Sequence, residues 1–344
     1  MKGIILSGGK GSRLAPITDN YPKQLVPVMG RPILFHCIEN LRKADIYDIQ
    51  IVLNPETGKI IEEKIRNEDF GVNISFLYQD APRGLAHAVG INREFTGDED
   101  FTVILGDNIF DESLTKMVKK FYDTKADSLI LIKEVDRPYD FGVVKFREDG
   151  KAEKLVEKPK TFVSRHAIVG VYLFSKNIYK FIDQVEPSPR GELEITDAIS
   201  AQVESGQNVS THILNSYWFD SGTRDGILDA NKTLLIESNK FDNVDSTIRD
   251  SYLHGNISVK EKTVIEGSNL MGPIFIGKNV RIYNSTLGPF TAIADNCVIE
   301  NSEVQDSIVM ENTSVRDSTL ISSVIHKNLD IYGKQFIINK LCGA

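Results

Sequence analysis

The sequence predicts two domains of different class: an α/β domain over residues 1–238 and a parallel β-helix over residues 244–326, followed by a tail at 327–344. The α/β domain is predicted by a short, β-branched apolar run at residues 4–6 that stops at paired glycines, which is typical of a buried parallel strand. The β-helix is predicted by apolar residues that recur every six positions in the last third of the chain. A chain of 344 residues is long enough for two domains.

The loop after the first strand is suited to bind an anion. Three glycines within residues 8–11 remove side chains where the backbone turns sharply and comes close to a ligand. Bare N–H groups in such a loop attract anions, and Lys10 and Arg13 add positive charge, so we expect a polyphosphate. Leu14 stands where the Rossmann fingerprint has its third glycine, and no stretch supplies a P-loop. A glycine turn that only caps a helix is the alternative.

The composition excludes several classes of protein. With 40 Lys and Arg against 48 Asp and Glu, the net charge of −8 argues against a general nucleic-acid binder. Three scattered cysteines fit neither a metal site nor a disulfide framework. We expect a cytoplasmic protein without a membrane partner, because the apolar core of the first residues is too short for a signal peptide and no long apolar segment follows. An acidic protein that binds phosphate must concentrate its cations, and the candidates are Lys10, Arg13, Lys23, Arg83, Lys158 and Arg190.

Apolar runs and helical spacings predict the elements of the α/β domain. A helix is expected to begin at Arg31-Pro32, with proline in its first turn and Leu34, Ile38 and Leu41 on its buried face. Further helices are expected at residues 60–65, after 84, after a loop at 187–197 with Thr196 at the cap, and at 223–238. Strands are expected at residues 2–7, 48–53, 74–78, 101–105, 128–135, 142–146, 152–156 and 168–174. The last four strands have no long helices between them, which indicates an antiparallel extension that holds an acceptor.

Two aspartates and one charged pair stand out in this domain. Asp107 and Asp220 each follow an apolar run, where a carboxylate costs free energy unless it meets a cation or water. An Asx turn is the alternative for Asp107, but the ligand-binding edge of the sheet favours Mg²⁺, which takes carboxylate, water and phosphate oxygens. Glu157 and Lys158 are either an exposed ion pair or a pair that binds a sugar hydroxyl and a phosphate.

The six-residue spacing of the last third does not fit a helix face, because successive positions would rotate off the apolar stripe. Asparagines and glycines supply turns between short β-branched runs, so we expect one short strand for each face of a prism. A sandwich of scattered strands is the alternative. We expect the β-helix to bury a face against another copy of the chain, which gives a homo-oligomer. The spaced apolar positions are Val264, Leu270, Ile276 and Ile282, followed after a five-residue step by Leu287, Ile293 and Ile299.

Eight stretches resemble, in order and spacing, the motifs of the glucose-1-phosphate thymidylyltransferases, a family of sugar-1-phosphate nucleotidyltransferases. They are GGKGSRLAPIT, PKQLVPV, QDAPRGLAHA, LGDN, FGVV, EKP, PSPRGELEITD and WFDSGT, between Met1 and about Glu237. The C-terminal hexads resemble the long form of this family. The resemblance implies a Rossmann-like, GT-A-like nucleotidyltransferase domain followed by a left-handed parallel β-helix.

The resemblance also implies residue roles. Asp107 and Asp220 are expected to hold Mg²⁺, and with Arg13, Lys23 and Lys158 they form the expected catalytic set. Residues expected at the nucleotide are Leu6, Gly8, Gly9, Gly11, Ser12, Arg13, Gln24, Gln79, Pro82, Gly84 and Asp107. Residues expected at the sugar phosphate are Asn108, Gly142, Glu157, Lys158, Val169 and Tyr172.

The implied reaction joins dTTP and glucose 1-phosphate into dTDP-glucose and pyrophosphate, by Mg²⁺-dependent in-line attack of the sugar phosphate on the α-phosphate. Gln24 and Gln79 each offer an amide donor and acceptor, which complement the imide edge of thymine or uracil. Three alternatives stay open: a UTP-dependent uridylyltransferase, a non-catalytic regulatory protein of the same build, and a bifunctional enzyme that also acylates an amino sugar. The last would need a histidine base, and the repeats offer only His254 and His326.

Overall fold

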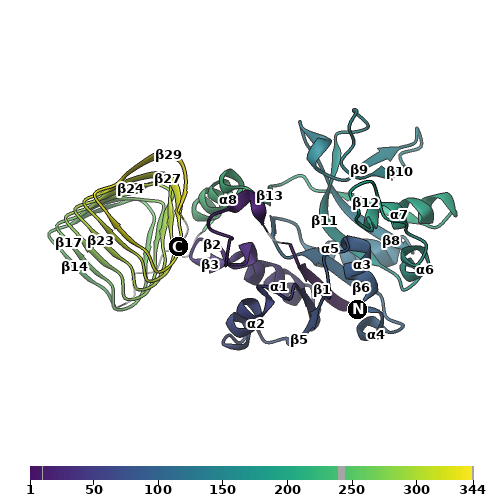
Figure 1. The fold of residues 1–344 in the computed structure, drawn as a ribbon, viewed down its shortest axis with the longest axis horizontal. Coiled ribbons are helices and arrows are strands. Elements are labelled where there is room, and N and C mark those ends of the chain that lie inside the picture. Colours follow the sequence, from purple (N-terminus) through teal and green to yellow (C-terminus); the bar gives the residue numbers. More distant parts are fainter. Residues whose placement is uncertain (10, 239–244, 343–344) are drawn as a thin grey trace. The chain divides into compact units, whose positions relative to one another are not determined.

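The computed structural model describes residues 1–9, 11–238 and 245–342, with side chains up to residue 336 (Figure 1). The chain packs as two compact units. The first unit contains residues 1–9 and 34–218, and the second contains residues 10–33 and 219–344. These units are defined by contacts within the structure, whereas the predicted domains were defined by the sequence pattern. The predicted domain boundaries at 238, 244 and 326 therefore stay a prediction.

The first unit is built on one mixed sheet. Its core strands are parallel: β1 (Lys2–Ser7) lies between β4 (Asp48–Leu53) and β6 (Phe101–Leu105), and β5 (Asn73–Tyr78) pairs with β4. An antiparallel extension begins at β11, which pairs with β6, β8 and β9, and β10 pairs with β9. This confirms the predicted parallel core with an antiparallel extension. The strands of the extension are β8 (Ser128–Glu134), β9 (Val143–Phe146), β10 (Ala152–Val156) and β11 (His166–Phe174), with β12 (Val209–Ile213) parallel to β8.

The predicted helices are present with two corrections, and the helices at residues 93–96, 114–123 and 178–182 were not predicted. Leu34, Ile38 and Leu41 of α1 are fully buried, as predicted. The helices are α1 (Ile33–Lys43), α2 (Gly58–Arg66), α3 (Leu85–Gly90), α4 (Arg93–Thr96), α5 (Leu114–Asp123), α6 (Ile178–Ile182), α7 (Ile195–Glu204) and α8 (Arg224–Glu237). Short elements complete the set: η1 (Ser12–Leu14), η2 (Lys23–Leu25), β2 (Pro27–Val28), β3 (Arg31–Pro32), β7 (Asn108–Phe110), η3 (Pro138–Asp140) and β13 (Trp218–Asp220). None of the helices within the described ranges is long and apolar enough to span a bilayer.

The first correction is the start of α1. Arg31 and Pro32 do not begin the helix but pair with Val28 and Pro27 in a short hairpin. Met29 and Gly30 form its turn with φ angles of 50° and 71°, the left-handed pair that a two-residue hairpin needs. The second correction is Thr196, which lies in the first turn of α7, because Glu194 takes the extended N-cap conformation.

The second unit contains the predicted β-helix. Figure 1 shows its coils stacked as a triangular prism, in which equivalent strands of successive coils pair in parallel. One face is formed by β14 (Thr247–Arg249), β17 (Val264–Glu266), β20 (Arg281–Tyr283), β23 (Val298–Glu300), β26 (Ser314–Arg316) and β28 (Asp330–Tyr332). The other strands are β15 (Tyr252–His254), β16 (Ile257–Val259), β18 (Asn269–Met271), β19 (Ile274–Ile276), β21 (Thr286–Leu287), β22 (Thr291–Ile293), β24 (Glu303–Gln305), β25 (Ile308–Val309), β27 (Thr319–Ile325) and β29 (Gln335–Cys342). This architecture agrees with the left-handed β-helix that the resemblance implies.

The coils are shorter than three hexads. The amide of Asn279 donates to Asn296, 17 residues later, and Asn296 donates to Asn312, 16 residues later. Interior residues therefore follow one another at steps of five or six. Six of the seven predicted positions are fully buried, but Val264 is only half-buried, because a five-residue step to Leu270 makes Ile265 the interior residue.

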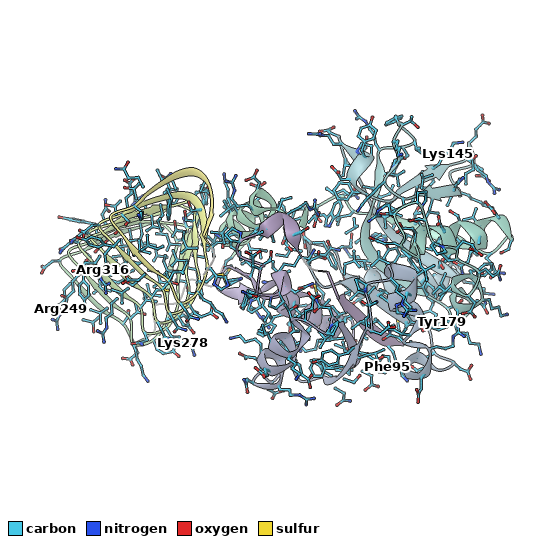
Figure 2. The ribbon with its side chains drawn as sticks, in the orientation of Figure 1. Phe95, Lys145, Tyr179, Arg249, Lys278 and Arg316 are labelled. Carbon is cyan, nitrogen blue, oxygen red and sulfur yellow. The ribbon has the colours of Figure 1, made fainter. Side chains whose placement is uncertain are left out.

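The corners and the outer faces of the β-helix are polar. Asn279, Asn296, Asn312 and Asn328 have positive φ angles and form a ladder of amide hydrogen bonds of 2.9, 3.1 and 3.0 Å. This confirms the predicted turn role of the asparagines. Arg249 and Arg316, labelled in Figure 2, form exposed ion pairs with Glu266 and Glu300 on the outer face.

Candidate active site

The residues predicted at the sugar phosphate gather around the carboxylate of Glu157 in the first unit. A Cβ added at Gly142 would lie 2.9 Å from Glu157 Oε2 and 3.0 Å from Thr196 Cγ2, so glycine lets the strand approach this carboxylate. Lys158 follows with a φ of 39°, and its N–H donates to Phe141 O at 3.1 Å. A lysine in this left-handed region is strained, and strain of this kind gathers at functional sites.

A second group of predicted residues surrounds Asn108. Its Nδ2 donates to Val169 O at 2.5 Å, and its Oδ1 accepts from Trp218 Nε1 at 3.1 Å. Both ends of the amide are therefore oriented by the protein. The indole of Trp218 packs on Phe141 with ring centroids 4.9 Å apart, next to Gly142 in the chain. Trp218, which begins the WFDSGT motif but was assigned no role from sequence, is thus part of this site.

The residues predicted at the sugar phosphate have unusual electrostatics. Burial, and then the neighbouring Glu194, raise the pKa of Glu157 from its ordinary 4.5 to about 7. Burial, and then Glu157, also raise the pKa of Tyr172, which lies beneath the site with its ring stacked on Phe174. Arg190 lies 3.4 Å from Glu157 and 3.3 Å from Glu194. This arginine, a predicted phosphate cation, therefore pairs with carboxylates in the structure, and its role at a phosphate stays a prediction.

Thr196 is a neighbour of this group that the sequence did not assign to the site. It is 1% exposed, and its Oγ1 has no hydrogen-bond partner among the described atoms. An unpaired buried hydroxyl costs about 1–3 kcal/mol, so such groups are uncommon unless a ligand completes them. The predicted helix-cap role gave no hint that its side chain would lie beside Gly142.

Part of the predicted nucleotide site lies in the first unit, at the ends of β1, β5 and β6. Gln79 is 6% exposed, with its Nε2 3.3 Å from His87 Nδ1, and a Cβ at Gly8 would lie 2.5 Å from Gln79 Oε1. Gly84 has a φ of 104° and no room for a side chain against the backbone of Leu193. The other residues of the set are Leu6, which is buried, Gly9 and Pro82, which are exposed, and Asp107, which is half-buried.

The rest of the predicted nucleotide site lies in the second unit. A Cβ at Gly11 would lie 3.2 Å from the Cβ and the Cδ of Lys23, so the glycine loop and the PKQL stretch pack directly against each other. Thr18 Oγ1 donates to Gly11 O at 2.7 Å and fixes this packing. Ser12 is exposed, and Lys10 lies outside the described residues.

Gln24 has a buried hydrogen-bond acceptor to which no donor is paired among the described atoms. The side chain is 1% exposed, and its Oε1 has no hydrogen-bond partner among the described atoms. Leaving such a buried acceptor unpaired costs about 1–3 kcal/mol. A ligand that supplies an N–H group, as the imide of a pyrimidine does, would remove this cost.

Asp220 and Asp107 have the donor chemistry for a hard cation. Asp220 Oδ1 accepts the N–H of Gly222 at 2.9 Å, and its Oδ2 lies 3.4 Å from Arg13 Nη2. Within the described residues there is no cluster of three or more His, Cys, Asp or Glu side chains that could hold a metal. Mg²⁺ needs only one or two carboxylates when water and phosphate oxygens complete its shell, so each aspartate has the donor chemistry for such an ion.

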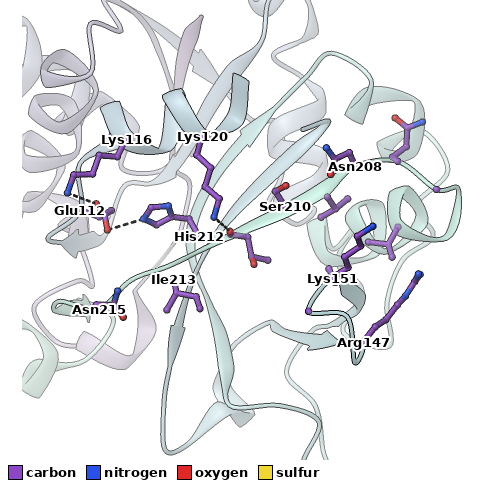
Figure 3. A pocket seen from close by; sticks show the side chains of 17 residues that line it. Glu112, Lys116, Lys120, Arg147, Lys151, Asn208, Ser210, His212, Ile213 and Asn215 are labelled. Atoms are coloured by element: carbon purple, nitrogen blue, oxygen red, sulfur yellow. Dashed lines mark hydrogen bonds and ion pairs between the residues drawn. The ribbon is translucent and has the colours of Figure 1, made fainter. Parts of the chain in front are cut away.

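A cavity of about 1050 Å³ lies elsewhere in the first unit, along β12 (Figure 3). Lys120 Nζ donates to Thr211 O at 2.8 Å, and His212 Nε2 lies 3.1 Å from Glu112 Oε2, as Figure 3 shows. Arg147 and Lys151 line its other end. None of the predicted site residues lines this cavity, so it is separate from the site that the motifs predict.

Comparisons with known proteins point to one family. The family described as nucleotidyl transferase matches residues 2–237. A glucose-1-phosphate thymidylyltransferase of Streptomyces griseus is 39% identical over 306 residues, which are 89% of this chain and 86% of that protein. A low-salt glycan biosynthesis nucleotidyltransferase of Haloferax volcanii is 36% identical over 308 residues, with the same two coverages.

Two solved structures are similar to this chain in fold. A Bacillus anthracis protein in complex with sucrose has a TM-score of 0.64 and 36% identity, and the match covers 70% of this chain and 98% of that one. A UDP-glucose pyrophosphorylase complexed with UDP-glucose has a TM-score of 0.62, covering 69% of this chain and 99% of that one. At 24% identity, the second match supports the fold alone.

The raised pKa of Glu157 predicts a pH-dependent effect of Glu157→Gln on stability. Between pH 4.5 and about 7 the folded protein binds more protons at Glu157 than the unfolded chain, so the free energy of unfolding falls as the pH rises through this window. At about 1.4 kcal/mol for each pKa unit, the loss reaches on the order of 3 kcal/mol above pH 7. Glu157→Gln should therefore raise the Tm at pH 8 and leave it nearly unchanged at pH 5, as measured by calorimetry.

Glu192→Gln is the matched control, because Glu192 pairs with the same Arg190 from an exposed position. It should change the pH dependence of the Tm much less than Glu157→Gln does, because Glu192 is the smallest of the causes that act on the pKa of Glu157. A Glu157→Gln protein that is less stable than the parent at pH 8 would show that the Glu157–Arg190 ion pair stabilises the fold, and that the pKa of Glu157 is not raised.

Proposed function

Because this chain belongs to the nucleotidyl transferase family, we propose that it transfers a thymidylyl group from dTTP to glucose 1-phosphate, which yields dTDP-glucose and pyrophosphate. The close approach of Gly142 to the Glu157 carboxylate, with Asn108 linked through Trp218 to Phe141, carries this proposal. The similarity to a glucose-1-phosphate thymidylyltransferase over 89% of the chain supports the same activity.

The reaction needs positioning rather than a protein nucleophile. A non-bridging oxygen of the sugar phosphate forms a bond to the α-phosphorus, and the bond from that phosphorus to the leaving pyrophosphate breaks on the opposite side. The attacking phosphate is already an anion, so no base has to remove a proton. Catalysis of such a displacement depends on holding the reactants in line and on neutralising charge.

Each charged side chain of the site has a place in this scheme. Lys158, on its strained turn, orients the attacking phosphate, and Glu157 accepts a hydrogen bond from a sugar hydroxyl. Arg13 and Lys23 neutralise the triphosphate. The amides of Gln24 and Gln79 pair with the imide edge of the base, which would satisfy the unpaired Gln24 Oε1.

We infer that a divalent cation, Mg²⁺, takes part when substrate is bound. Asp107 and Asp220 would hold it. The ion would supply charge neutralisation at the α-phosphate and on the leaving pyrophosphate. Until then, the contact of Arg13 with Asp220 offsets the charge of this carboxylate.

We also propose that the protein acts in the cytoplasm as a homo-oligomer, with nucleotide and sugar phosphate as its partners and without nucleic acid or membrane. The β-helix supports the oligomer, because Tyr252 and Met271 are 81% and 48% exposed on its neighbouring strands β15 and β18. Exposed apolar groups on adjacent strands are suited to bury against a second copy.

The substrate assignment predicts a ranking of triphosphates. Pyrophosphate release with glucose 1-phosphate should be fastest with dTTP, slower with UTP, and poor with ATP and GTP, because both glutamine amides suit a pyrimidine imide. Reactions without sugar phosphate are the control and should release none. If a purine triphosphate gave the highest kcat/KM, the base assignment would be wrong, and if UTP did, the enzyme would be a uridylyltransferase.

The metal assignment predicts the effect of two substitutions. Asp107→Asn and Asp220→Asn should each lower kcat by roughly 10²-fold or more while the fold stays intact, because each removes part of the charge that holds the cation. Asp98→Asn, at a 91% exposed side chain, is the control and should keep full activity. EDTA should abolish the activity of the parent enzyme, and added Mg²⁺ should restore that activity. Near-normal turnover in both folded variants would make these aspartates turn residues.

A further inference from the structure

The loop of residues 10–33 carries Arg13, Lys23 and Gln24 but has little regular structure of its own. It contains the two 3-10 turns η1 and η2 and the two-residue strands β2 and β3. Its backbone hydrogen bonds, such as Leu14 N–H to Gly11 O and Leu25 N–H to Pro22 O, close local turns within the loop. Its conformation depends on the side chains against which it packs, and these belong to the β-helix and to α8.

The first anchor is Tyr21. Its ring is 5% exposed and packs edge-to-face on His326, with centroids 5.2 Å apart and an interplanar angle of 89°. Lys327 Nζ lies 4.5 Å from the centroid of the same ring. On its other side, Tyr21 OH donates to Leu25 O at 3.3 Å. Lys23 and Gln24 lie between Tyr21 and Leu25 in the chain, so this anchor brackets both.

The second anchor is the turn between β2 and β3. Met29 N donates to Asn231 Oδ1 at 2.9 Å, and Asn231 Nδ2 donates to Phe290 O of the β-helix at 3.0 Å. Asn231, on α8, is fully buried with both ends of its amide in use. At Gly30, any Cβ would overlap the ring of Phe275, which comes from β19. The turn therefore lies directly against Phe275 of one coil and is linked through Asn231 to Phe290.

His326 is explained by this contact. It is 8% exposed, its Nδ1 lies 3.1 Å from Lys327 O, and burial lowers its pKa, so a neutral ring packs against Tyr21. A buried histidine with these contacts is poorly placed to act as a base for an acyl acceptor. This weakens the bifunctional alternative, for which the repeats supplied His326 as one of two histidines.

We propose that the β-helix is a working part of the nucleotide site: through Tyr21, His326 and Asn231 it holds the 10–33 loop in the shape that binds the triphosphate. This inference rests on the proposed function for its kinetic consequences. The three residues are positioning residues, because they act through the loop. The β-helix then has a role in each subunit, in addition to any role in assembly.

The test uses the full-length protein with His326→Ala and its conservative partner His326→Phe. The alanine removes the ring beneath Tyr21, whereas phenylalanine keeps an edge-to-face contact. With His326→Ala the KM for dTTP should rise by roughly fivefold or more, while the KM for glucose 1-phosphate should change by less than about twofold. His326→Phe should restore the parent KM for dTTP.

Val315→Ala is the matched control, since Val315 is fully buried in β26, in the other sheet of the β-helix. It should lower the Tm without raising the KM for dTTP. A rise in both substrate KM values with His326→Ala, or the same rise with Val315→Ala, would mean that the β-helix only stabilises the fold. An unchanged KM for dTTP with His326→Ala would remove the coupling altogether.

Hydrogen–deuterium exchange separates this inference from the proposed function, because it needs no turnover. His326→Ala should speed amide exchange in residues 18–29 and leave residues 101–107 of the first unit unchanged, and His326→Phe should reverse the change. If the parent enzyme did not use dTTP, the proposed function would fail while the exchange result could still support the contact. If the exchange of residues 18–29 did not change, the positioning role would be wrong even for an active enzyme.

Discussion

The packing of the 10–33 loop is the constraint on which the site depends. An acidic chain can bind a triphosphate only if it gathers cations locally, and Arg13 and Lys23 stand on a loop that regular hydrogen bonding does not fix. Glycine at position 11 lets the loop close on Lys23, and glycine at position 30 lets it lie against Phe275. Glycine thus gives the loop conformational freedom, and long-range contacts restrict that freedom at the proposed triphosphate site.

The residues predicted at the sugar phosphate lower the stability of the free protein, unlike the contacts that hold the loop. Glu157 is half-buried near Glu194, and one arginine, Arg190, pairs with Glu157, Glu194 and Glu192. This arrangement raises the pKa of Glu157 and lowers the stability of the free protein near neutral pH. In the proposed reaction, the same burial keeps water from competing with a sugar hydroxyl for the carboxylate. Strain at Lys158 and an unpaired Thr196 Oγ1 place further free-energy costs at this group.

Much of the fold could be predicted because its signals are local. Strands at Lys2–Ser7 and Asp48–Leu53 and the buried face of α1 followed from apolar runs and helical spacing. The start of α1 could not be predicted, because Met29 and Gly30 have positive φ angles and form the turn of a hairpin that includes Arg31. The pairing of Arg190 with carboxylates and the contact of Tyr21 with His326 could not either, because their partners come together only in three dimensions. The motifs were sufficient to predict the site residues, whereas the contacts that position these residues are visible only in the structure.

The central claim is that a sugar phosphate attacks the α-phosphorus directly, with the protein supplying position and charge but no nucleophile. The stereochemistry at this phosphorus is its most direct test. With dTTP that carries a single sulfur in place of one α-oxygen, one in-line displacement predicts dTDP-glucose with inverted configuration. Retention would mean two displacements through a nucleotidyl–protein intermediate, which would contradict the account.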